Sequence, residues 1–288
     1  MRNYVIFADS ACDISRDLLN DWGVKYCSLS LTFSDDPKEY SDYEIPSHEF
    51  YEKMRNGALP KTSAANTAKF CDAFEGIVKD GFDILYLAFS SGLSATVDFA
   101  RQAADEIIGN YPESRILVVD SLCASAGYGL LVKLLVDKKN EGADIEQLAE
   151  YAENTKLHVT HWFTVDDLKY LKAGGRISAT TALLGGMLNI KPVMKVDENG
   201  KLISVSKARG RKAALKAIAE KYAETALDKK NGTVFISHGD CIDDANALAD
   251  MIRENSGATV NLITNIGPVI GSHSGPGTLA LFFLVEER

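Results

Sequence analysis

The first half of the chain contains the stretch Phe82-Asp83-Ile84-Leu85-Tyr86-Leu87-Ala88-Phe89, and a helical pattern over Ala95–Ile108 follows it. The stretch is almost continuously apolar, which is typical of a strand that is buried on both faces. In the segment after it, apolar residues recur at the spacing of one helix face. A buried strand followed by an amphipathic helix predicts a parallel sheet with helices on its faces.

The same alternation extends in both directions from this stretch. Further strands are predicted at Asn3–Ala8, Val24–Phe33 and Arg115–Val119. Helical patterns cover Thr67–Val78, Tyr128–Val136 and Ile145–Glu153. We therefore expect an α/β protein whose residues 1–157 form an N-terminal α/β/α domain with a parallel sheet.

The second half differs in pattern. Glu198-Asn199-Gly200 predicts a hairpin between Pro192–Asp197 and Lys201–Ala208, because Asn-Gly favours a tight hairpin turn. Other strands are predicted at Val159–Val165, Thr233–Ser237, Thr259–Thr264 and Leu279–Val285, and helices at Arg211–Leu227 and Asp243–Asn255. Residues 158–288 are thus expected to form an α+β two-layer domain. Because no long linker separates the halves, a ligand is expected between the two domains.

Composition narrows the class of protein. The chain has 288 residues, 46% of them hydrophobic, and a formal net charge of −9, which argues against a nucleic-acid partner. The five cysteines are scattered and form no C-x-x-C pair, so we expect neither a disulfide framework nor a thiolate metal site, and a cytoplasmic location. His158 and His161 are interpreted as structural histidines and not as metal ligands, and no cofactor is expected.

The run Ile266–Gly277 is rich in glycine and proline and is expected to form a loop. Backbone N–H groups there would lie beside the imidazole of His273 and the hydroxyls of Ser272 and Ser274. Such a set suits a small anion, for example a carboxylate. The alternative is a tight structural turn with a satisfied histidine.

Two further segments place hydroxyls next to predicted helices. The segment Ser90–Thr96, which includes Ser91 and Ser94, either caps a helix or offers an anion site, and both interpretations stay open. It lacks the Walker pattern of nucleotide-binding loops. In Lys61–Asn66, Thr62 and Ser63 are either ligand donors or residues that lead into the next helix.

Charged residues add candidates. Asp9 and Asp120 follow predicted strands and either line a site or hydrogen-bond loop amides. In Gly174-Gly175-Arg176, the arginine pairs either with an anion or with an internal carboxylate.

A basic cluster is formed by Lys207, Arg209, Arg211 and Lys212. It is either a solvated surface or a docking site for an acidic partner. A serine hydrolase that uses Ser91 or Ser94 with His273 on acyl or phosphate esters is kept as an alternative function, although no G-x-S-x-G motif occurs.

Taken in order, the motifs of this chain resemble those of the DegV family of bacterial fatty-acid-binding proteins. The matching stretches cover nearly the whole chain and are Ala8–Ile14, Lys61–Ser63, Ser90–Ser94, Val119–Ser121, Asp167–Ser178, Leu188–Pro192 and Gly267–Gly277. Each stretch alone is a weak signal, but the ordered set is specific.

The resemblance implies a lipid-binding carrier, and not an enzyme, that holds a long-chain fatty acid in a buried apolar tunnel. The carboxylate is expected at Thr62, Ser94 and His273, with Ser63, Ser91, Arg176 and Ser274 as further candidates. The tunnel is expected to involve Leu183-Leu184 and Met187-Leu188. The resemblance also implies that the carboxylate is presented to a separate fatty acid kinase, which forms an acyl phosphate for phospholipid synthesis. We expect the basic cluster to dock this kinase, and transient membrane contact is compatible with this role.

Overall fold

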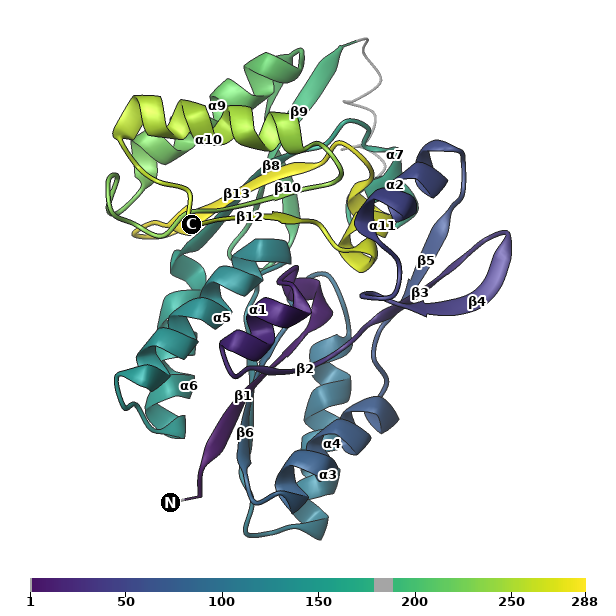
Figure 1. The fold of residues 1–288 in the computed structure, drawn as a ribbon, viewed down its shortest axis with the longest axis vertical. Coiled ribbons are helices and arrows are strands. Elements are labelled where there is room, and N and C mark those ends of the chain that lie inside the picture. Colours follow the sequence, from purple (N-terminus) through teal and green to yellow (C-terminus); the bar gives the residue numbers. More distant parts are fainter. Residues whose placement is uncertain (1, 179–188) are drawn as a thin grey trace.

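The computed structural model describes residues 2–178 and 189–288 (Figure 1). Their strands form three sheets. Four parallel strands make the N-terminal sheet, in the order β2 (Lys25–Cys27), β1 (Tyr4–Asp9), β6 (Asp83–Ala88) and β7 (Ile116–Asp120). On one face lie α3 (Thr67–Lys79) and α4 (Thr96–Asn110), and on the other lie α5 (Ser125–Asn140) and α6 (Ile145–Thr155). The predicted parallel α/β/α arrangement is confirmed.

The C-terminal sheet has six strands. Their order is β10 (Leu202–Arg209), β9 (Ile190–Val196), β8 (Val159–Thr164), β13 (Leu279–Leu284), β11 (Phe235–His238) and β12 (Leu262–Asn265). All neighbours are antiparallel except β11 and β12. The helices α9 (Arg211–Thr225) and α10 (Ile242–Ser256) pack on one face, where Ile218 and Leu248 are fully buried. The predicted mixed two-layer part is also confirmed, including the Asn-Gly hairpin.

A third sheet was not foreseen. It is antiparallel, in the order β4 (Asp36–Ser41), β3 (Ser30–Phe33) and β5 (Pro60–Ser63), and α2 (Ser47–Arg55) lies between β4 and β5. The predicted single strand Val24–Phe33 is therefore wrong. The strand is interrupted between β2 and β3. There the Leu29 N–H donates to Ser10 Oγ, 3.0 Å away, and not to the carbonyl of a neighbouring strand. The two pieces consequently join different sheets.

The predicted loop Ile266–Gly277 is also wrong in part, because it contains a helix, α11 (Pro268–Ser274). Proline at the first helical position has no N–H to satisfy, which favours a helix start there. Gly275, at φ 83°, ends the helix in a backbone conformation that suits glycine. A second short helix, α7 (Lys169–Ala173), lies beside α11. The remaining elements are α1 (Arg16–Asp21), η1 (Ser10–Cys12) and η2 (Lys156–His158).

Helix α5 connects the two larger sheets. It contacts β1 of the parallel sheet and β8, β11 and β13 of the six-stranded sheet (Figure 1). Gly127 allows this close approach, because a Cβ there would lie 2.3 Å from His161 Nε2. One apolar core accordingly includes residues from both halves, such as Tyr128 and Phe282. The boundary at residue 157 stays a prediction.

Candidate ligand cavity

A cavity of about 660 Å³ lies between the two larger sheets. On one side it is lined by Phe89, Leu93 and Ala124, which follow the carboxyl ends of β6 and β7. On the other side it is lined by residues of β8 and β13, among them Phe163 and Phe282. The position agrees with the general rule that ligands of open α/β sheets bind beyond the carboxyl ends of the strands. The volume falls within the roughly 300–1,000 Å³ of small-molecule sites.

Most of the cavity wall is apolar. Its apolar side chains come from the six-stranded sheet, from α7 and α11, and from segments next to the strands of the other two sheets: Leu29, Leu59, Phe89, Leu93, Phe163, Tyr170, Leu171, Val196, Leu202, Ile266, Val269, Ile270 and Phe282. The expected tunnel residues Leu183-Leu184 and Met187-Leu188 lie outside the described residues. Such a wall excludes water and offers an apolar chain a favourable environment.

Several of the candidate polar residues line this cavity. Strand β5 supplies Thr62 and Ser63, the loop before α4 supplies Ser94, and α11 supplies His273 and Ser274. Thr62 Oγ1 and His273 Nε2 are 2.8 Å apart and form a hydrogen bond, although 211 residues separate them in the sequence. The structure therefore brings these candidates to one cavity, and their contact with a ligand remains a prediction.

Arg176 joins the same group of residues. Its Nε and Nη2 donate to Leu93 O at 3.1 and 2.9 Å, and its Nη1 donates to Gly174 O. Gly174 in turn lies against His273, since a Cβ on Gly174 would stand 2.1 Å from His273 Nδ1. Burial lowers the pKa of Arg176, but a guanidinium stays protonated in proteins. A fixed positive charge is thus present beside the imidazole.

His273 is neutral near pH 7. Burial, and then the charge of Arg176, lower its pKa to about 4. Two buried polar atoms of the lining residues, His273 Nδ1 and Ser274 Oγ, have no hydrogen-bond partner among the described residues. Buried polar atoms without partners are uncommon in folded proteins, and ligand sites are one place where they occur.

Two candidate serines differ in placement. Ser94 lines the cavity, where its Oγ lies 2.8 Å from Thr96 Oγ1 and accepts from the Thr96 N–H. Ser91 is exposed and is not among the lining residues, so its expected ligand role is not supported. The N-cap position of α4 is Ala95, which makes no side-chain bond, so Ser94 meets the first N–H of this helix from one residue before the cap.

The aspartates after the strands hold loops. Asp9 is fully buried and accepts from Tyr86 OH and from the N–H groups of Ala11 and Phe89. Asp120 accepts from the Ser91 and Leu122 N–H groups. Neither residue lines the cavity, so the structural interpretation of both fits better.

Sequence reasoning missed His161 as a cavity residue. It lies on β8, lines the cavity, and is held by the Ala124 N–H at its Nε2 and by Val159 O at its Nδ1. Burial lowers its pKa well below the ordinary value, so the ring is neutral. A signal for this was available in the sequence. His161 and Phe163 are two residues apart in a strand, so their side chains are on the same face, and both line the cavity.

The basic cluster is split by the structure. Lys207, Arg209 and Lys212 are exposed. Arg211 is instead half-buried and forms ion pairs with Asp244 at 2.8 Å and Asp166 at 3.7 Å. A docking role for Arg211 is therefore disfavoured, while the other three stay candidates.

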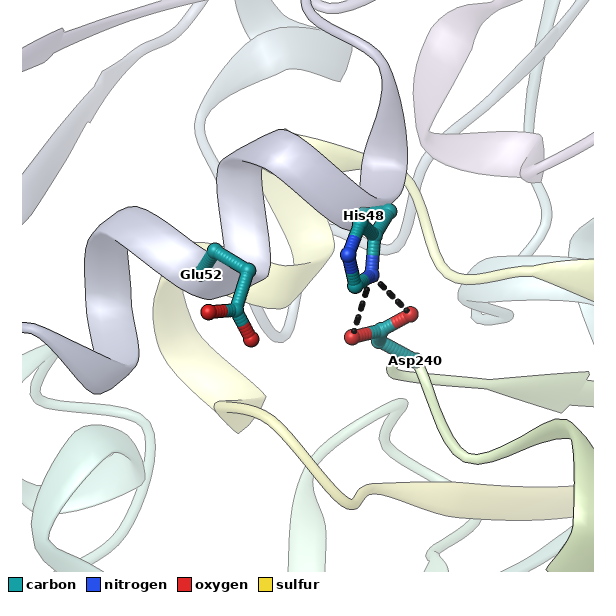
Figure 2. A group of neighbouring side chains, drawn as sticks. All are labelled: His48, Glu52 and Asp240. Atoms are coloured by element: carbon teal, nitrogen blue, oxygen red, sulfur yellow. Dashed lines mark hydrogen bonds and ion pairs between the residues drawn. The ribbon is translucent and has the colours of Figure 1, made fainter.

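A separate cluster lies outside the cavity. Figure 2 shows His48 and Glu52 on α2 and Asp240 after β11, with His48 Nδ1 3.1 Å from each Asp240 oxygen. These three side chains could hold a metal ion by their spacing. However, Arg55 already pairs with Glu52 at 2.8 Å and with Asp240, so positive charge is present without a metal. We interpret the cluster as an ion-pair contact between α2 and the C-terminal sheet.

Comparisons with known proteins agree with this architecture. The family model described as "Uncharacterised protein, DegV family" matches residues 3–286. The chain belongs to the DegV family. A DegV domain-containing protein of Clostridium perfringens is 43% identical over 291 residues, covering 100% of this chain and 99% of the relative.

Solved structures of similar proteins share the fold. A protein of Thermus thermophilus, described by its fatty acid binding, is 32% identical with a TM-score of 0.88, and the match covers 99% of this chain and 100% of that one. A stearic-acid-binding protein of Eubacterium ventriosum is 25% identical with a TM-score of 0.89 and 98% coverage of both chains. Within the described ranges of the present DegV protein, none of the helices has the length and apolar character needed to cross a bilayer.

Proposed function

We propose that this DegV family protein binds a long-chain fatty acid, with the acyl chain in the cavity between the sheets. The supporting observation is the division of one cavity into a mostly apolar wall and a group of polar side chains around Thr62 and His273. Burial of the chain supplies most of the affinity, at roughly 0.8 kcal/mol per methylene. The fatty acids bound by the T. thermophilus and E. ventriosum relatives support this ligand class.

The carboxylate is held by neutral donors near a fixed cation. His273 Nδ1 faces Gly174, whose carbonyl oxygen accepts from Arg176. The positive charge favours a lone pair at Nδ1, so the proton of the neutral ring resides on Nε2 and is donated to Thr62 Oγ1. The Thr62 O–H is then free to donate to the ligand carboxylate. Ser63, Ser94 and Ser274 also line the cavity and are proposed as further donors.

The head group is expected near solvent. Lys61, Ser63 and Ala64, on and after β5, line the cavity and are exposed, and so are Ala95 and Ala173. This rim makes the carboxylate accessible to a second protein. We propose that a cytoplasmic fatty acid kinase reaches it there to form an acyl phosphate for phospholipid synthesis, guided by Lys207, Arg209 and Lys212. Transient contact with a membrane would load the carrier.

The test separates a carrier from a hydrolase. The purified protein is extracted with solvent for mass spectrometry, and delipidated protein is titrated by calorimetry with stearic acid and, separately, with vaccenic acid. In parallel, chromogenic acyl and phosphate esters are incubated with the protein. Bound fatty acid and saturable titration without ester turnover support the proposal. Ester turnover that disappears in His273→Ala, or failure to bind stearic acid and vaccenic acid, would overturn it.

A further inference from the structure

Helix α11 carries His273 and Ser274, yet it has no cap of its own. It spans seven residues, and its N-cap Gly267 offers no side chain. Helices this short are unstable in isolation, so their position depends on contacts with the rest of the protein. The first N–H groups of a helix also require partners from outside the helix.

Two buried carboxyl groups supply those partners. Asp42 Oδ1 accepts from the Val269 N–H at 2.7 Å, and Asp13 Oδ1 accepts from the Gly267 N–H at 2.9 Å. Asp13 follows η1 beyond the parallel sheet, and Asp42 follows β4 of the three-stranded sheet. Helix α11 is thus attached at its N-terminal end to both parts of the N-terminal half.

The two carboxyls lie close together around Gly267. A Cβ on Gly267 would stand 2.9 Å from Asp13 Oδ1 and 3.3 Å from Asp42 Oδ1, so an added methyl group would press on both carboxyls. Asp13 is 5% exposed and Asp42 is 3% exposed, and Asp42 Oδ2 has no partner among the described residues. Burial raises the pKa of Asp42 to about 7 and that of Asp13 well above its ordinary range.

Asp13 also reaches the cavity wall directly. Its Oδ2 accepts from Ser125 Oγ, at 2.5 Å, and Ser125 is a lining residue at the start of α5. The backbone carbonyl of Asp13 accepts from Thr264 Oγ1 at 3.0 Å. Asp13 therefore connects α5 and α11, which both contribute lining residues, with β12 of the six-stranded sheet.

We propose that Asp13 and Asp42 are positioning residues for the fatty acid site, which fix the start of α11 so that His273 meets Thr62. This proposal rests on the proposed function and goes beyond it, because neither Asp13 nor Asp42 lines the cavity. Burial of two neighbouring carboxyls is costly for folding. Both carboxyls bond to the start of the helix that carries the head-group residues. A role in positioning that helix would explain why two costly buried carboxyls are found there.

The experiment compares Asp42→Ala with Asp42→Asn. The asparagine keeps a carbonyl oxygen for the Val269 N–H, whereas the alanine leaves that N–H without a partner. We expect Asp42→Ala to weaken vaccenic acid binding about tenfold in calorimetry, and Asp42→Asn to stay within about threefold of wild type. The assigned imidazole signals of His273 in NMR spectra should shift in Asp42→Ala and stay near wild type in Asp42→Asn.

Asp83→Ala is the matched control. Asp83 is a buried carboxylate, 1% exposed, that pairs with Arg2 and Arg115 and is absent from the cavity wall. This variant should lower the melting temperature and leave vaccenic acid affinity and the His273 signals unchanged. If Asp42→Ala does not fold, Gly267→Ala replaces it, because its methyl group would displace both carboxyls.

The outcomes distinguish the two proposals. Wild-type protein that does not bind vaccenic acid refutes the proposed function itself. Wild-type binding with unchanged affinity in Asp42→Ala or Gly267→Ala refutes only the positioning role. The positioning role is also refuted if Asp83→Ala loses affinity in proportion to its lower melting temperature. In that case any loss of stability would explain the weaker binding of Asp42→Ala.

Discussion

Replacement of Thr62 by valine tests the chemistry of the head-group site most directly. Valine keeps the β-branched shape that suits strand β5 and removes only the hydroxyl. In the structure this hydroxyl is bonded to His273 Nε2 at 2.8 Å, and the proposed function assigns its proton to the ligand carboxylate. The variant therefore loses one donor to a charged group and leaves the His273 Nε2–H without an acceptor.

The expected loss of affinity is set mainly by the lost hydrogen bond to the carboxylate. A hydrogen bond to a charged group contributes about 1.5–3 kcal/mol. Since about 1.4 kcal/mol corresponds to a tenfold change in dissociation constant, binding should weaken roughly 10- to 150-fold. The acyl chain keeps its apolar contacts, so some affinity should remain.

The assay is calorimetric titration of delipidated protein with stearic acid, combined with thermal unfolding. Thr62→Ser restores a hydroxyl and should stay within about threefold of wild type, and Ser91→Ala, at an exposed position outside the cavity, should bind normally. Undiminished binding by Thr62→Val would refute the assigned donor. An equal loss in Thr62→Ser would show that packing, and not the hydroxyl, matters at this position.

Three further predictions concern His273, Gly174 and the basic cluster. Because burial lowers the pKa of His273 to about 4, the unfolded chain takes up its proton first as the pH falls from 6.5. Wild type should therefore lose up to about 3 kcal/mol of unfolding free energy between pH 6.5 and 4 relative to His273→Gln, measured by urea unfolding, and parallel pH profiles would contradict this. Gly174→Ala places a methyl group 2.1 Å from His273 Nδ1 and should weaken stearic acid binding at least tenfold, whereas Gly76→Ala meets no atom within 4 Å and should bind like wild type. Lys207→Glu combined with Arg209→Glu should leave fatty acid binding intact and reduce kinase-dependent phosphorylation and its salt sensitivity, and unchanged phosphorylation would reduce these residues to a solvated surface. Arg211→Glu should instead lower the melting temperature, because it breaks the pairs with Asp166 and Asp244.

The sequence predicted elements well where the pattern was strong. The buried strand at residues 82–89 and the hairpin around Asn199-Gly200 are both present, because continuous apolar runs and Asn-Gly turns act locally. Strand β3 was not separated from β2, since nothing within residues 24–33 shows that the two pieces pair in different sheets. That choice depends on Pro60–Ser63, which lies about thirty residues further along the chain.

The sequence predicted which residue types form the candidate site, but it did not predict how these residues contact one another. The hydroxyls and the histidine were visible as residue types in three separate segments of the sequence, and the resemblance to one family singled them out together. The hydrogen bond between Thr62 and His273 could not be read from spacing, because it joins positions 211 residues apart. The anchoring carboxyls of Asp13 and Asp42 were missed for the same reason, since their partners Gly267 and Val269 lie more than 220 residues later.

The exposed rim at Lys61, Ser63 and Ala64 has a consequence for how such a carrier would diversify. If a kinase docks at the rim as proposed, it would meet the same carboxylate whatever acyl chain lies in the cavity. Selection among acyl chains would then depend on lining side chains such as Phe163 and Leu202. Related carriers could change their preferred chain by interior substitutions alone and still share one downstream enzyme.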